Sequence, residues 1–126
     1  MSWKDSGFAA LTSAVAHTAR LRVDYAAGLV VVADATSAGI GTVKYNTAAG
    51  DPVGVSLMNK PGTHEMVADG AIADGADVYA AANGKVCALP VAAGTYYKVG
   101  IALSAAGEDG DIIEVLPVEY GKAVTV

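Results

Sequence analysis

From Leu21 onward, short runs rich in Val and Ile alternate with polar turns at intervals of roughly 8–12 residues. Gly, Asp, Asn and Pro separate the runs, and these residues favour turns. The pattern predicts strands over Leu21–Tyr25, Leu29–Ala33, Gly41–Tyr45, Pro52–Leu57, His64–Val67, Asp77–Ala80, Lys85–Leu89, Tyr97–Leu103 and Asp111–Pro117. Such spacing is typical of an all-β protein, a small β-barrel or sandwich.

The clearest turn signal along the chain is the dipeptide Asn83-Gly84. Both residue types tolerate a positive φ and fit the two-residue turn that matches the twist of paired strands. The dipeptide therefore predicts a hairpin that joins Val78-Tyr79 to Val86-Cys87.

The chain before these strands has a different character. The segment Phe8–Ala19 is rich in small apolar residues and is compatible with a helical turn or two, although so short a helix is marginal on its own. We divide the chain into an extended N-terminal arm, residues 1–19, and a β-rich domain, residues 20–126. The arm is either disordered or ordered against a neighbour, and Tyr120–Val126 poses the same choice.

The composition indicates a thin core. Hydrophobic residues make up 53% of the chain, charged residues only 17%, and the mean hydropathy is +0.41. Most of the apolar residues are small Ala and Val, each of which gains less on burial than Leu or Phe. Apolar surface with few charges predicts an oligomer or assembly subunit, with a secreted Ala-rich monomer as the alternative.

The net charge of −5 argues against a nucleic-acid partner, because the eight Lys and Arg residues are scattered. The lone Cys87 has no intrachain disulfide partner and is expected to be a small buried hydrophobe. The longest apolar stretch, Ala26–Ala33, is far shorter than the roughly 20 residues of a membrane helix, and the start of the chain lacks the pattern of a signal peptide. We expect a protein made in the cytoplasm, with no membrane partner.

Candidates for chemistry are few. His64-Glu65 begins like a zinc-protease motif, but the second His of that motif is missing. Two acidic groups have the oxygen donors that Ca²⁺ prefers, but lack the spacing of a calcium-binding loop and suit turns equally well. These are Glu108, Asp109, Asp111 and Glu114, and Asp69, Asp74 and Asp77. We therefore predict no catalytic residue, no metal site and no cofactor, and do not expect an enzyme.

The chain's only Trp and only Phe, Trp3 and Phe8, both lie in the predicted arm. An arm that docks into another subunit uses aromatic anchors to gain contact area at low entropic cost. We predict Trp3 and Phe8 as partner-binding anchors, and packing of these side chains on the arm's own domain stays open as the alternative.

The second half of the chain resembles the capsid cement, or head-decoration, proteins of tailed phages. The resemblance covers roughly Gly70–Leu116 and rests on four segments, with a weaker match at Gly50–Leu57. The four are Ala73–Tyr79, Asn83–Val86, Val99–Ala106 and Gly110–Val115. It implies a homotrimer that binds the major capsid protein on the outer surface of the virion and stabilises the shell.

The sequence thus predicts a structural capsid decoration protein. The alternative is a phage tail or fibre β-domain that acts as an assembly module. Binding to expanded heads separates the two, because a tail module has no reason to bind them.

Overall fold

The computed structural model describes residues 8–126, except 14, 27 and 60–61. The described chain is built of β-strands with one short 3₁₀ turn, which confirms the predicted all-β class. The strands are β1 (Phe8–Thr12), β2 (Arg22–Ala26), β3 (Leu29–Val32), β4 (Gly41–Val43), β5 (Pro52–Leu57), β6 (His64–Asp69), β7 (Asp77–Ala80), β8 (Val86–Cys87), β9 (Thr95–Ala102), β10 (Asp109–Leu116) and β11 (Ala123–Thr125), and the turn η1 spans Ala82–Gly84.

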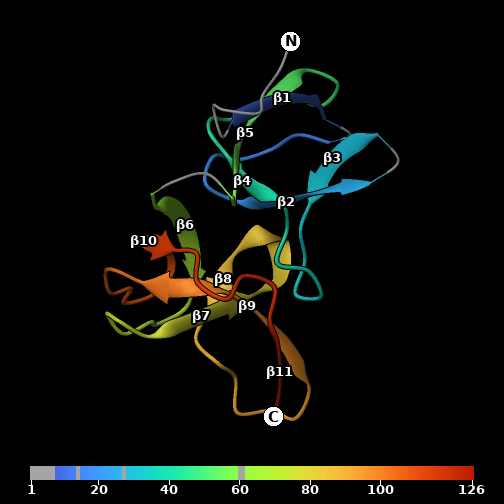
Figure 1. Cartoon of the computed structure of the whole chain (residues 1–126). Coiled ribbons are helices and arrows are strands. Elements are labelled where there is room, and N and C mark those ends of the chain that lie inside the picture. Colours follow the sequence, from blue (N-terminus) through green and yellow to red (C-terminus); the bar gives the residue numbers. More distant parts are fainter. Residues whose placement is uncertain (1–7, 14, 27, 60–61) are drawn as a thin grey trace.

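The strands form two sheets that follow the order of the chain. The first sheet has the order β1-β5-β4-β2-β3, and the second has β10-β6-β8-β7-β9-β11. In the second sheet β10 also pairs with β9. Strand pairing therefore runs from β10 through β6, β8, β7 and β9 and back to β10. Figure 1 shows the first sheet, coloured blue to green, above the second, coloured olive to red.

Each sheet has its own core of small side chains. The first core consists of Val23, Val30, Val43, Val53 and Val55, all at most 2% exposed. The second is larger and includes Met66, Ile72 and Ile113. The largest fully buried side chain is Arg22, which is charged. The two apolar cores are thus accompanied by a buried charged side chain, Arg22, at the place where the sheets meet.

The predicted hairpin at Asn83-Gly84 is confirmed, with a longer loop. Tyr79 pairs with Cys87 and Ala80 pairs with Val86 in an antiparallel ladder. Asn83 has a φ of 60° and Gly84 a φ of 75°, as the residue types predicted. The backbone N–H of Ala81 donates to the carbonyl of Lys85 at 2.9 Å, and this pair encloses three residues, Ala82–Gly84. The loop is therefore the three-residue 3₁₀ turn η1 and not a two-residue turn.

All nine predicted strands are present, with ends shifted by a few residues. Two strands were not predicted, β1 and β11. The helical interpretation of Phe8–Ala19 is wrong over residues 8–12, which pair antiparallel with β5. A partner strand supplies backbone hydrogen bonds that override the helix preference of two alanines. Part of the predicted arm is thus an edge strand of the first sheet, while β11 pairs with β9.

Candidate interaction surfaces

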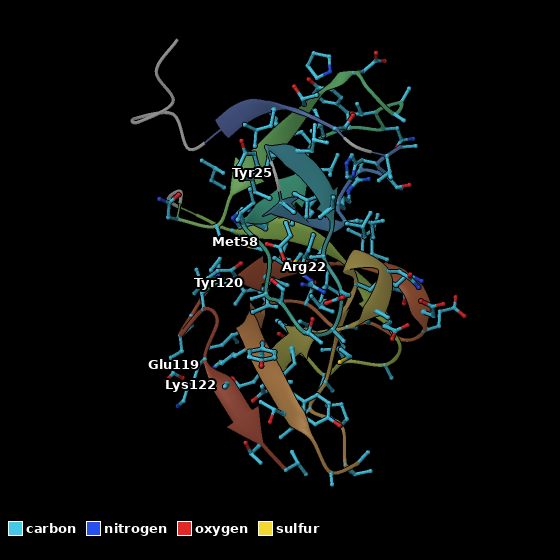
Figure 2. The ribbon with its side chains drawn as sticks, turned by 90° about the vertical axis from the view of Figure 1, so that its right-hand side faces the viewer. Arg22, Tyr25, Met58, Glu119, Tyr120 and Lys122 are labelled. Atoms are coloured by element: carbon cyan, nitrogen blue, oxygen red, sulfur yellow. The ribbon has the colours of Figure 1, made fainter. Side chains whose placement is uncertain are left out.

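Arg22 connects the two sheets through backbone carbonyls. Its side chain, on β2, donates to the carbonyls of Ala81 at 2.7 Å and Lys85 at 3.0 Å, on either side of η1. It also donates to the carbonyls of Ser37 and Asp34, in the loop after β3. Figure 2 shows Arg22 between the sheets. Burial lowers the pKa of Arg22 to about 10, so the guanidinium stays charged at neutral pH.

The close approach of η1 to β2 depends on a glycine. A Cβ atom on Gly84 would lie 2.8 Å from the carbonyl oxygen of Arg22 and 3.1 Å from its amide nitrogen, both of them backbone atoms. Gly84 also has a φ of 75°, which other residues rarely adopt. The hairpin loop therefore packs on β2, close enough for Arg22 to reach its carbonyls.

A second polar cluster ties the C-terminal segment to β9. The Lys98 ammonium lies 2.8 Å from a Glu119 carboxylate oxygen and 3.4 Å from Asp77, and its side chain is only 7% exposed. Lys122 lies 3.1 Å from the other Glu119 oxygen. Hydrogen bonds from Lys98 and Lys122 hold the pKa of the Glu119 carboxyl below its ordinary value of 4.5. The ionised form of Glu119 is thus favoured by folding.

We expect this cluster to make stability depend on pH. The pKa of Glu119 is lower in the folded state than in the unfolded chain, so its contribution is present above pH 4.5 and is lost as the pH falls through the folded-state value. Urea unfolding should therefore show wild type more stable than Glu119→Gln at pH 7, with the difference vanishing in acid. Glu108→Gln, at an exposed turn, is the matched control and should lack this trend. A difference that grows in acid would contradict the assignment.

The outer side of the second sheet exposes apolar residues. Alternation along β10 buries Ile113 and Val115 and turns Ile112 and Leu116 outward, where they are 49% and 38% exposed. We call the outer face the surface formed by Val67, Ile101, Leu103, Ile112 and Leu116. Ile112 pairs with Val67 and Leu116 with Ile101, while Leu103 is hydrogen-bonded to the backbone of Glu114 and is 49% exposed.

Acidic side chains lie beside these apolar positions. Glu65 is directly opposite Glu114 on the paired strands β6 and β10, and Asp77 is opposite Ile101. Arg20 lies 3.5 Å from Glu65, and Thr63 donates to Glu114 at 2.7 Å. An apolar centre with a polar rim is the usual composition of a protein interface. The outer face therefore suits a protein partner.

A groove of about 480 Å³ lies between the two sheets. We call it the inter-sheet groove; it is lined mainly by Ile40, Leu57, Met58, Pro117 and Tyr120, with Gly39 and Asn59. Figure 2 places Met58 and Tyr120 on one side of the molecule, near the junction of the sheets. Burial raises the pKa of Tyr120 to about 12, which keeps its hydroxyl neutral.

His64 and Glu65 lie on opposite faces of β6, although both line one pocket. His64 and Glu65 are consecutive on β6, so His64 is buried while Glu65 is exposed. The Nδ1 atom of His64 is within 3.1 Å of the Thr42 hydroxyl. A pocket of about 330 Å³ lined by His64, Glu65, Thr42 and other residues lies there. Strand geometry places the two side chains on opposite faces, unlike the helical metal motif.

The acidic groups have other partners. Asp111 accepts hydrogen bonds from the backbone N–H of Gly107 at 2.8 Å and of Glu108 at 3.2 Å, which caps a turn. Asp109 pairs with Lys85 at 2.8 Å. Among the residues that the structure describes, no cluster of three or more His, Cys, Asp or Glu is arranged to hold a metal ion. In the same residues no helix is long and apolar enough to cross a membrane.

The two predicted anchors lie at the start of the chain. Trp3 is outside the described residues, and Phe8 is the first residue of β1, opposite Ser56. Sequence reasoning missed Arg22, the outer face and the inter-sheet groove. The alternation from Asp111 to Pro117 was a signal for the outer face, but apolar residues on both sides of the strand concealed which side is exposed.

Comparison with known proteins identifies the family of this chain. A family model described as phage cement protein matches residues 8–117. The chain belongs to the phage cement protein family. Membership makes it a structural protein of the phage head, and it confirms the resemblance seen in the sequence.

A solved structure has the same fold as this cement protein. The N base of head fiber gp8.5 of bacteriophage phi29 superposes with a TM-score of 0.74 at 13% identity, covering 91% of this chain and 96% of that one. No curated protein sequence matches. At this identity the likeness concerns the fold, and it spans both sheets.

Proposed function

We propose that this cement protein binds the outer surface of the phage head and stabilises contacts between major capsid proteins. Family membership over residues 8–117 carries the proposal, and the outer face supplies a surface that suits it. Three large apolar side chains on one sheet face, each more than a third exposed, favour burial against another protein. The protein is made in the host cytoplasm and added to the shell.

The proposed form is a homotrimer. A single outer face offers few apolar side chains, so one subunit alone would bind the shell weakly. When one subunit has bound, the second and third bind intramolecularly, and such avidity raises affinity by roughly 10²–10⁴-fold without new contacts. The role of Trp3 and Phe8 as anchors on a neighbour stays a prediction. A structural role needs no catalytic residue, cofactor or metal, and we propose none.

The competing candidate is a fibre β-domain, which the shared fold with a head fibre base favours. Electron microscopy of purified virions, with mass spectrometry to count copies, separates the two. We expect many copies in a fixed ratio to the major capsid protein, spread over the outside of the shell. A few copies confined to fibres or the tail would establish the alternative, and absence from the particle would overturn both.

A further inference from the structure

The inter-sheet groove has an apolar lining that is only partly covered: Ile40, Leu57 and Pro117 are half-buried, while Met58 is 7% exposed and belongs to the second core. Its lining includes Leu57 and Met58 from the end of β5 and Pro117 and Tyr120 from the segment after β10. Tyr120 is 37% exposed although it lies beside Met58. An aromatic ring, a thioether and a proline suit a flat apolar side chain, since sulfur–aromatic and aromatic pairs add to simple area burial.

The start of β1 lies next to this groove. β1 is antiparallel to β5 with Phe8 opposite Ser56, so the chain preceding Phe8 begins where β5 continues into Leu57 and Met58. In Figure 2 β1 begins on the same side of the molecule as the labelled Met58 and Tyr120. Five positions separate Trp3 from Phe8, and an extended chain covers up to about 17 Å over that length. Trp3 is therefore within reach of the groove.

We propose that the inter-sheet groove is the docking site for residues 1–7 of the same chain, with the Trp3 indole as the buried group. The tether favours the chain's own segment, because a short linker gives an effective concentration in the millimolar range. Trp3 could anchor on a partner or pack on its own domain, and the proposal is that in the free protein it packs on its own domain. The proposal concerns the free protein and is independent of binding to the phage head.

Fluorescence tests the proposal directly, because Trp3 is the only tryptophan of the chain. In the full chain we expect Trp3 to be severalfold less accessible to acrylamide than in urea. Tyr120→Ala, which opens the groove, should restore most of that accessibility. Tyr45→Ala removes an equally large side chain that is 57% exposed in the loop between β4 and β5, and should leave the accessibility of Trp3 unchanged. Equal quenching in the folded wild type and in urea would overturn the proposal.

Cross-linking separates a chain's own segment from that of another copy. Ser2→Cys with Asn59→Cys, in a Cys87→Ser background, keeps Trp3 and should form a disulfide within one chain, so that the species keeps its monomer mass on a non-reducing gel. Ser2→Cys with Val91→Cys is the control and should not cross-link, because Val91 is on the loop between β8 and β9 and is 98% exposed. Covalent dimers from the first pair would overturn the proposal in favour of exchange between copies.

Discussion

Replacing Arg22 by methionine should lower the free energy of unfolding by about 3–5 kcal/mol, at the upper end for a single substitution. Methionine fills much of the space but donates no hydrogen bond. Four backbone carbonyls, those of Asp34, Ser37, Ala81 and Lys85, lose the guanidinium that they share. The carbonyls of Lys85 and Asp34 keep a backbone N–H donor, from Ala81 and Ser37, so the loss falls mainly on the carbonyls of Ser37 and Ala81. Each buried acceptor left unsatisfied costs about 1–3 kcal/mol.

Urea unfolding monitored by circular dichroism measures this loss. Arg20→Met is the matched control, because Arg20 pairs with Glu65 at 3.5 Å through side chains that are about half exposed. Exposed ion pairs contribute about 0–1 kcal/mol, so the control should stay near wild type. Arg22→Lys keeps the charge but not the planar guanidinium with its several donors. Its free energy of unfolding should lie between those of Arg22→Met and Arg20→Met. Equal stabilities of Arg22→Met and Arg20→Met would show that the sheets are joined by other contacts.

The importance of Arg22 follows from the composition of the cores. Among the described residues the fully buried part of the first core is five valines, with Leu11, Ile40 and Leu57 partly buried against it, so its apolar burial is modest. A buried arginine that satisfies four carbonyls from two loops offsets the cost of burying those carbonyls. It also fixes the loop after β3 and the η1 hairpin to β2. The two sheets are thereby held in one arrangement, as the proposed contact with the shell would require.

Most of the fold was predictable from local signals. Val- and Ile-rich runs marked nine strands, and Asn83-Gly84 marked the β7–β8 hairpin, because both signals act within a few residues. β1 and β11 were missed because both are short and because β1 contains two alanines, which favour helix. Each is held by a distant partner, β1 by β5 and β11 by β9. Pairing across such separations is not encoded in the local pattern.

The interaction surfaces were harder to predict, for the same physical reason. Ile112, Ile113, Val115 and Leu116 are all apolar, so the pattern identified the strand but not its exposed side. Only the pairing of Ile113 with Met66 in the second core decides which residues face inward. Arg22 gave no signal, because a lone arginine in a strand is usually exposed. Its burial depends on loops 12 to 63 residues away.

The double substitution Ile112→Ser with Leu116→Ser should weaken binding to phage heads by about 10- to 100-fold per subunit, if the outer face contacts the shell. Burying a fully exposed side chain of this size gains about 1.5–3 kcal/mol, and these two are already half or more buried, so the pair loses about half of that each; 1.4 kcal/mol corresponds to a factor of ten. In a trimer the loss is repeated in every subunit. Because both residues are outward-facing and 49% and 38% exposed in the free protein, the fold should lose far less stability than the complex.

The comparison pair is Leu89→Ser with Val91→Ser, which removes two apolar side chains that are 42% and 98% exposed on the loop between β8 and β9. Sedimentation of heads lacking their own copy, with added purified protein, measures the affinities. If non-specific hydrophobic contact drove binding, the two double substitutions would weaken it equally. If the loop were the contact, the comparison pair would abolish binding and the outer-face pair would not. Selective loss in the outer-face pair, at unchanged unfolding midpoint, places the shell contact on the strand residues whose alternation exposes them.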